Sequence, residues 1–224
     1  MRTPKTTQIP SLMPTVFTIG HSTRSVEEFL DLLKPHGIQL LVDVRRFPAS
    51  RRYPHFNGAS LAQSLKDAGI QYHHMPGLGG RRPARRDSPN TGWRNTGFRG
   101  YADYMQTDEF WEALEELIGR AETRPYPISP TRPGRAETRP YPISPARPGR
   151  AETRPYPTVI MCAEAVPWRC HRNLISDALV TKGWRVLHIL SATRMDTHTL
   201  TSFAKVSAHK LLYPAATGGQ PSLF

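Results

Sequence analysis

The sequence predicts a single α/β domain with a mainly parallel sheet and flanking helices, rhodanese-like or doubly wound. Short apolar runs alternate along the chain with segments whose apolar residues recur at helical spacing. Two of the runs, Leu40–Val42 and Val159–Met161, are apolar at every position, as expected of parallel strands buried on both faces. A length of 224 residues suits one domain with its own core and some appendages.

Five segments have the composition of β-strands, since they are short and rich in β-branched, aromatic and other apolar residues. In order they are 16–19, 40–44, 70–75, 159–161 and 186–190. The last of them is expected to be the final strand of the chain.

Four further segments have apolar residues spaced for one face of a helix. In order they are 25–34, 61–68, 101–118 and 174–182. Ser25 and Glu28 form a capping box at the start of the first helix, and Pro35 ends it. A glycine stands close to the end of each of the other three, as is typical of helix termini.

A Pro-rich repeat interrupts the alternation of strand and helix. Arg120 to Gly134 recurs almost letter for letter as Arg135 to Gly149, and a partial third copy starts at Arg150. Each 15-residue unit has too many prolines for the interior of a helix or sheet, and too few apolar residues to stack as a solenoid. We therefore expect a tandem duplication that loops out of the domain in an extended form.

The domain boundaries follow from this reading of the repeat. We expect residues 15–119 and 150–213 to form the domain and residues 120–149 to be the insertion. Residues 1–14 are expected to be a disordered lead-in, and residues 214–224 a flexible tail.

The charge balance predicts a polyanionic partner or substrate. Lys and Arg number 30 against 18 Asp and Glu, a net charge of +12, and the basic character survives removal of two repeat units of +2 each. Two cysteines are too few for a disulfide framework, and the N-terminus lacks the apolar segment of a signal peptide. We therefore expect a cytoplasmic protein that does not bind a membrane.

Both cysteines lie in one short stretch that also contains other chemically reactive side chains. Cys162 and Glu164 follow the predicted strand 159–161, and Cys170, His171 and Arg172 close the same loop. A thiol, a carboxylate, an imidazole and a guanidinium at this spacing are the ingredients of a nucleophile site, an anion site or a metal site.

Polar residues follow other predicted strands as well, and the carboxyl ends of parallel strands meet at the edge where α/β proteins bind ligands. We expect a composite site there. The candidate catalytic residues are Cys162, Glu164, His171, His21 and Asp43. The candidate ligand-binding residues are Ser22, Arg45, Arg169, Cys170, Arg172 and His74.

Four motifs resemble a known family. They are T-I-G-H-S at Thr18 to Ser22, D-V-R-x-x-P-x-S at Asp43 to Ser50, L-G-G at Leu78 to Gly80, and C-x-E followed by C-H-R at Cys162 to Arg172. In this order they resemble the family catalogued as domain of unknown function 488, over about Val16 to Leu190. The resemblance implies a single α/β domain whose polar motifs gather at one site, without a settled reaction.

Three chemistries fit the predicted site. In the first, Cys162 is a nucleophile as in rhodanese-like sulfurtransferases and Cys-based phosphatases, although Arg169 stands one residue later than their Cys-x5-Arg loops require. In the second, Arg45, Arg169 and Arg172 bind a phosphate or nucleic-acid backbone, with acid–base work by a carboxylate and a histidine.

The third chemistry is a metal held by Cys162, Cys170 and His171, with help from His21 or His74. Their spacing is not a standard zinc signature, so we expect no cofactor from the sequence.

Two segments bear on partners. The loop 81–99 has six arginines together with Trp93 and Phe98, a composition that suits a phosphate backbone and a stacked base. The chain ends in Gln220-Pro-Ser-Leu223-Phe224 after two glycines. This ending resembles the peptide by which bacterial DNA polymerases and repair proteins dock on the sliding clamp.

The sequence therefore predicts a DNA-associated protein, an enzyme of nucleic-acid repair or processing that binds a phosphate-containing ligand at the carboxyl edge of the sheet. A non-catalytic nucleic-acid or sliding-clamp adaptor is the alternative, for which replacing Cys162 leaves activity in the cell intact. A rhodanese-like or phosphatase-like Cys-dependent transferase is the third hypothesis.

Overall fold

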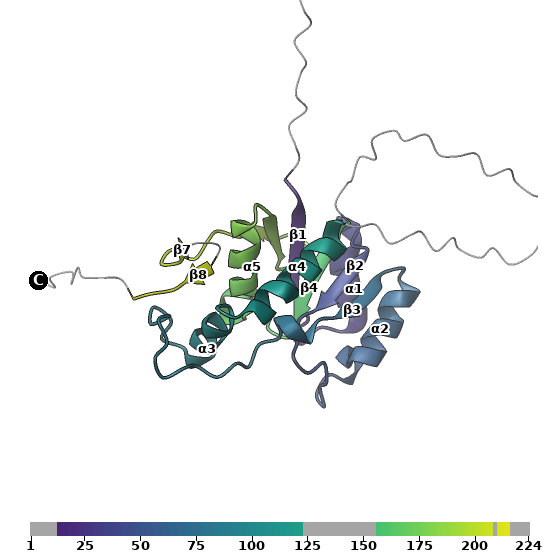
Figure 1. Ribbon diagram of the computed structural model, residues 1–224. Helices are drawn as coiled ribbons and strands as arrows, with labels where there is room; N and C mark the ends of the chain where they lie inside the picture. Colours follow the sequence, from purple (N-terminus) through teal and green to yellow (C-terminus); the bar gives the residue numbers. More distant parts are fainter. Residues whose placement is uncertain (1–12, 123–155, 208–209, 216–224) are drawn as a thin grey trace, which may run out of the picture.

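The computed structural model describes residues 13–122, 156–207 and 210–215 (Figure 1). Most of the expected Pro-rich insertion, the N-terminal lead-in and the clamp-binding sequence at Gln220, Leu223 and Phe224 lie outside these residues. No helix within the described ranges is both long and apolar enough to cross a membrane.

A six-stranded sheet in the order β3-β2-β4-β1-β5-β6 forms the centre of the described domain. The strands are β1 (Thr15–Gly20), β2 (Leu40–Asp43), β3 (Gln71–His74), β4 (Thr158–Cys162), β5 (Arg185–Ile189) and β6 (Met195–Thr197). The first five strands run parallel, and β6 pairs antiparallel with β5. This sheet confirms the predicted single α/β domain.

Helices cover both faces of the sheet. They are α1 (Val26–Leu33), α2 (Gly58–Asp67), α3 (Thr96–Tyr104), α4 (Asp108–Glu122) and α5 (Arg172–Thr181). Buried residues of α1 and α2 pack in one apolar cluster, whereas those of α3, α4 and α5 pack in another. Figure 1 shows α4 and α5 lying across one face of the central strands.

The alternation of side chains along each strand decides which cluster a residue joins. In β4, Ile160 and Cys162 belong to the cluster under α3–α5, whereas Val159 and Met161 belong to the cluster under α1 and α2. The strand therefore delivers the Cys162 thiol to the α5 side of the sheet.

Local signals explain several element ends. The predicted capping box is confirmed: Ser25 Oγ accepts from Glu28 N, and the Glu28 carboxylate accepts from Ser25 N. The segment predicted as one helix at 101–118 is instead two, α3 and α4. Asn95 caps α3, which therefore begins at Thr96, before the predicted start at residue 101. The chain then turns after Met105, and the Met105 carbonyl accepts a hydrogen bond from Trp111 Nε1 of α4.

The prediction that the strand at 186–190 ends the sheet is wrong. The chain adds β6 and then a two-stranded antiparallel sheet of β7 (Lys205–Ser207) and β8 (Lys210–Leu212). Each of these strands is only three residues long, which is too short for a hydrophobic period to mark it in the sequence.

Two copies of the repeat contribute residues to the described domain. Helix α4 runs on to Glu122, beyond the boundary expected at residue 119, and buries Ala121. Tyr156, from the partial third copy, is also buried, and its N–H donates to the Ala121 carbonyl at 2.6 Å. The first and third copies therefore supply the end of α4 and the approach to β4.

Gly20, at the end of β1, allows the closest backbone approach in the site region. A Cβ atom added there would lie 1.8 Å from the Glu164 carbonyl oxygen. We expect Gly20→Ala to lower the free energy of unfolding by about 2–3 kcal/mol, because backbone on both sides must move. Urea unfolding followed by circular dichroism measures this change.

Gly119 is the matched control, since it lies within α4 and a Cβ added there meets no atom within 4 Å. Gly119→Ala should raise stability by about 0.5–1 kcal/mol through helix propensity. Equal stability of Gly20→Ala and the wild type would contradict the close approach.

Candidate functional site

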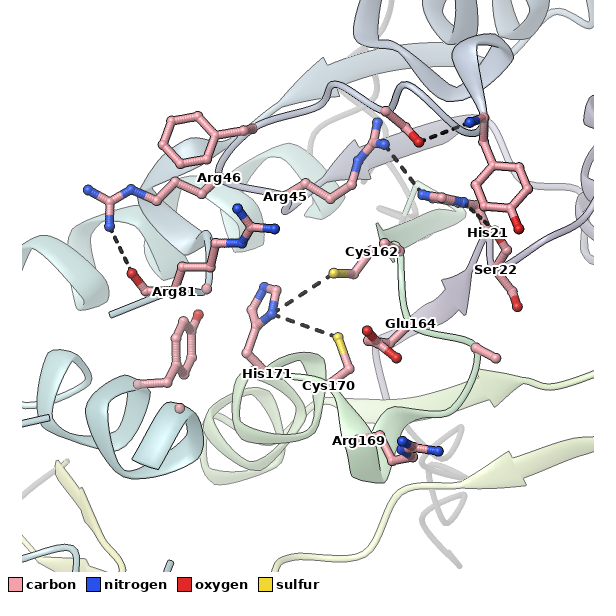
Figure 2. Close-up of a pocket in the computed structure, with 18 of the residues that line it drawn as sticks. His21, Ser22, Arg45, Arg46, Arg81, Cys162, Glu164, Arg169, Cys170 and His171 are labelled. Atoms are coloured by element: carbon pink, nitrogen blue, oxygen red, sulfur yellow. Dashed lines mark hydrogen bonds between the residues drawn. The ribbon is translucent and has the colours of Figure 1, made fainter. Parts of the chain in front are cut away.

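A cavity of about 750 Å³ opens at the carboxyl ends of β1, β2 and β4 (Figure 2). Its walls come from the turn after β1, the loop after β2, the start of α3 and the loop between β4 and α5. The cavity therefore lies at the edge of the sheet where ligands of parallel α/β proteins bind.

Eight of the residues predicted from the sequence line this cavity. They are His21, Ser22, Arg45, Cys162, Glu164, Arg169, Cys170 and His171. Asp43, Arg172 and His74 do not line it and instead hydrogen-bond to groups in its wall.

Two thiols and one imidazole form a compact group on one wall. His171 Nδ1 lies 3.7 Å from Cys170 Sγ and 4.0 Å from Cys162 Sγ. His171 Nε2 lies 3.0 Å from the Val44 carbonyl oxygen, which can only accept a hydrogen bond. Nε2 therefore carries a hydrogen, and in the neutral ring Nδ1 presents its lone pair to both sulfur atoms.

Gly80 of the L-G-G motif makes room for this imidazole. A Cβ atom added at Gly80 would lie 2.8 Å from His171 Nδ1. The motif is thus part of the site although it carries no reactive side chain, and a glycine is needed because the backbone passes directly beside the ring.

The two thiols have opposite tendencies to ionise. Hydrogen bonding to Cys170, followed by burial, raises the pKa of the Cys162 thiol well above its usual value. Burial also opposes ionisation of Cys170, but the hydrogen bond from Cys162 and the nearby His171 and Arg172 hold the pKa of Cys170 well below its usual value. The hydrogen bond between the thiols and the nearby Arg172 thus favour ionisation of Cys170 over Cys162.

Arg172 supports this wall from inside the protein, where its side chain is fully buried. Its Nε donates to Cys170 Sγ at 3.4 Å, and its Nη2 donates to the Glu164 carbonyl oxygen. Because these bonds hold the guanidinium, it orients the loop and not a ligand in the cavity. Arg172 was predicted from the sequence to bind the ligand. Its burial could not be recognised there, because no sequence pattern marks a buried arginine at the start of a helix.

A buried chain of hydrogen bonds leads away from Arg172. Arg172 Nη1 donates to Thr18 Oγ1 at 3.3 Å, and Thr18 Oγ1 lies 2.8 Å from His188 Nδ1. His188 Nε2 lies 3.0 Å from His198 Nδ1, and His198 Nε2 lies 2.9 Å from Asp177 Oδ1.

The two ends fix the direction of the terminal bonds in this chain. The Arg172 guanidinium can only donate, and the Asp177 carboxylate can only accept. Thr18 Oγ1 therefore accepts from Arg172, and His198 Nε2 donates to Asp177. No pattern in the sequence marks this chain of hydrogen bonds, because His188, His198 and Asp177 lie in separate segments without a common motif.

A second buried group holds Arg45 in the opposite wall. Its Nε donates to Asp43 Oδ1 at 2.8 Å, its Nη2 also donates to the Asp43 carboxylate, and Tyr72 Oη donates to Asp43 Oδ2 at 2.9 Å. His74 Nε2 donates to the Arg45 carbonyl at 2.8 Å. Asp43 and His74 therefore position Arg45.

His21 completes this wall. Its Nδ1 lies 3.0 Å from the Ser22 carbonyl oxygen, so Nδ1 donates and Nε2 is left as an acceptor, 3.4 Å from Arg45 Nη1. Burial, and then the charge of Arg45, lower the pKa of His21 to about 4. The ring is therefore neutral at pH 7.

The cavity is strongly positive. Five arginines but a single carboxylate, Glu164, are found among the described residues that line it. The arginines are Arg45, Arg46, Arg52, Arg81 and Arg169. Only Arg45 and Arg169 were predicted as site residues, although the Arg-Arg pairs at 45–46, 51–52 and 81–82 were a signal for the others.

The loop 81–99 divides between the core and the cavity. Trp93 stacks on Phe98 with ring centroids 4.8 Å apart, and also contacts Phe203 and Tyr213. Trp93 therefore anchors the loop to the C-terminal segment, whereas Phe98 lines the cavity.

Together, fold and site define an α/β protein with an arginine-lined cavity around paired cysteines and a histidine. Residues 25–128, a little under half of the chain, match the model of the family described as Domain of unknown function DUF488. This match supports the family indicated by the motifs; it includes D-V-R and L-G-G but ends before the cysteines. No curated protein and no solved structure matches the chain.

The buried chain of hydrogen bonds predicts a dependence of stability on pH. Burial, and then the charges of His198 and Arg172, lower the pKa of His188 to about 3. Between the usual value of about 6.5 and 3, the unfolded state binds a proton that the folded state excludes. His188 alone should therefore lower the free energy of unfolding by up to about 1.4 kcal/mol for each pH unit of acidification in this window.

The measurement is urea unfolding at several pH values for the wild type and His188→Gln. We expect a shallower dependence on pH for the variant, whatever its stability at neutral pH. The same slope in both proteins would show that His188 is not held neutral by the fold.

Proposed function

We propose that this protein is an enzyme of nucleic-acid repair or processing that binds a phosphate-containing ligand in the carboxyl-edge cavity. The observation that carries the proposal is the lining of five arginines against one carboxylate. Guanidinium groups bind phosphate oxygens through charge-assisted and often bidentate hydrogen bonds, so this lining suits a phosphate group.

Arg45 is suited to anchor the ligand. Its bonds to Asp43 and to the Phe56 carbonyl hold the guanidinium in one orientation, so little rotamer entropy is lost when a ligand binds. Arg46 and Arg169 lie at more open positions of the cavity and would follow a longer phosphate backbone.

Aromatic side chains in the cavity favour a nucleic-acid ligand over a simple phosphate. Tyr53 and Phe98 line it together with Phe47, which is 62% exposed. Trp168, beside Arg169, is 57% exposed. Exposed aromatic rings next to arginines are the arrangement on which unpaired bases stack. A volume of about 750 Å³ lies within the range of small-molecule sites and suits a nucleotide.

We assign the acid–base steps to Glu164 and His21, which line the cavity with the arginines. His21 has Nε2 as an acceptor beside Arg45 Nη1, so it can accept a hydrogen bond from the ligand, while Asp43 acts through Arg45. Cys162 and His171 are the remaining candidate catalytic residues, on the opposite wall.

The two other hypotheses receive less support. The raised pKa of Cys162 weighs against a nucleophilic thiolate at that position, as a Cys-dependent transferase would need. A non-catalytic clamp adaptor depends on Gln220, Leu223 and Phe224, which lie outside the described residues.

A short single-stranded DNA labelled with fluorescein tests the nucleic-acid proposal by fluorescence anisotropy. Arg46→Ala and Arg169→Ala should each weaken binding by about tenfold, because each removes a charged hydrogen bond worth about 1.4 kcal/mol. Each variant should also reduce the slope of log K against log salt by about 0.7 for one lost phosphate contact.

Arg194→Ala is the matched control, because Arg194 is also exposed but pairs with Asp196 away from the cavity. Its affinity should stay within about twofold of the wild type. Equal losses in all three variants would indicate general charge attraction, and absence of binding by the wild type would contradict the proposal.

The C-terminal sequence gives a separate prediction about a partner. Removing Gln220 to Phe224 should abolish binding to a purified bacterial sliding clamp in surface plasmon resonance, because apolar anchors carry most of the energy of such peptides. Replacing Leu223 and Phe224 by Ala should have the same effect, whereas Ser222→Ala should not. Unchanged binding after the deletion would end the clamp hypothesis.

A further inference from the structure

We propose that Cys162, Cys170 and His171 bind a zinc ion that keeps one coordination position open to the cavity. The proposal uses the same cavity as the proposed function, but it does not depend on nucleic acid being the ligand. It assigns a metal site that the spacing of these residues in the sequence did not predict.

The distances among the three side chains are close to those of a tetrahedral zinc site. Zinc lies about 2.3 Å from sulfur and about 2.0–2.1 Å from nitrogen, so a tetrahedral angle separates N from S by about 3.6 Å. His171 Nδ1 lies 3.7 and 4.0 Å from the two sulfur atoms, and all three ligand atoms lie within 4.8 Å of one another. Both distances from His171 Nδ1 to sulfur therefore lie within a few tenths of an ångström of the tetrahedral value.

The hydrogen bonding of His171 is that of a metal ligand. A histidine that binds a metal through one nitrogen usually donates the hydrogen of the other to a carbonyl or carboxylate. Here Nε2 donates to the Val44 carbonyl at 3.0 Å, which leaves the Nδ1 lone pair directed at the space between the thiols (Figure 2). Gly80 leaves room on the same side of the ring.

Groups behind the thiols also suit a zinc thiolate. Arg172 Nε donates to Cys170 Sγ at 3.4 Å, and N–H donors to sulfur stabilise metal-bound thiolates. Arg172 is itself fixed by Thr18 and the chain of hydrogen bonds that ends at Asp177. Two thiolates neutralise a divalent ion, so the charge of the arginines that line the cavity remains to attract an anion.

The ligand set selects both the metal and the type of site. Two thiolates and an imidazole favour zinc over the hard cations Mg²⁺ and Ca²⁺, which prefer oxygen ligands. Three protein ligands with a free fourth position define a catalytic and not a structural zinc site. All three residues line the cavity, so the fourth position falls to water or to an oxygen of the anionic ligand.

Titration with Co²⁺ under reducing, oxygen-free conditions tests the proposal. Cobalt replaces zinc in such sites and shows a thiolate-to-cobalt charge-transfer absorption. The full chain should bind one equivalent, and zinc should displace it. Cys162→Ser, Cys170→Ser and His171→Gln should each weaken binding by at least about 100-fold, since the loss of even an outer-shell partner costs 10–100-fold.

His36→Gln is the matched control, because His36 ends the short 3-10 helix Lys34–His36 that follows α1, away from the cavity. It should bind cobalt as the wild type does. Far-ultraviolet circular dichroism verifies that each variant is folded. For the wild type, zinc should also raise the unfolding temperature in proportion to the logarithm of its concentration, and the Cys variants should lose this shift.

Absence of stoichiometric binding by the reduced wild type would overturn the proposal, as would cobalt binding that survives in the folded Cys162→Ser and Cys170→Ser variants. Arg169→Ala separates the two proposals. It should keep the cobalt spectrum of the wild type even though it weakens DNA binding, so failure of the metal site and failure of nucleic-acid binding are distinguishable.

Discussion

The buried guanidinium of Arg172 is the interaction on which the site depends. It stands at the start of α5 and joins three parts of the fold: Cys170, the Glu164 carbonyl of the loop after β4, and Thr18 of β1. An unpaired charge at this depth would be costly, and its nearest partners are neutral or weakly acidic. The chain of hydrogen bonds through His188 and His198 connects these partners to a distant carboxylate, Asp177.

The pleat of the parallel strands arranges the rest of the site around this anchor. Cys162 points to the α5 side of β4 and meets Cys170 and His171, whereas Asp43 in β2 has its partners Arg45 and Tyr72 in the other wall. The cavity lies between the two walls, with the two cysteines and His171 on one and Arg45 with His21 on the other (Figure 2). Each wall has its own buried hydrogen bonds, so both are fixed before a ligand binds.

The two proposals are mutually consistent because both place an anion in the same cavity. A zinc ion with an open position and a cluster of arginines would each attract a phosphate oxygen, and the exposed rings of Phe47 and Trp168 would contact the bases beside it. The family match supports the fold and its motifs but carries no reaction. The chemistry of the cavity therefore provides the argument for function.

The sequence by itself determined the α/β class, the parallel strands and the edge at which the polar motifs collect, because hydrophobic period and chain direction are local properties. It did not separate helices α3 and α4, because the Asn95 cap starts α3 upstream of the apolar pattern. It also did not reveal β6 to β8, because these strands are too short to show a hydrophobic period. Only the folded chain decided that Arg172, Asp43 and His74 support the walls, and that His188 and His198 lie behind them. Burial and side-chain direction arise from contacts between residues more than a hundred positions apart, such as Thr18 with His188 and Val44 with His171.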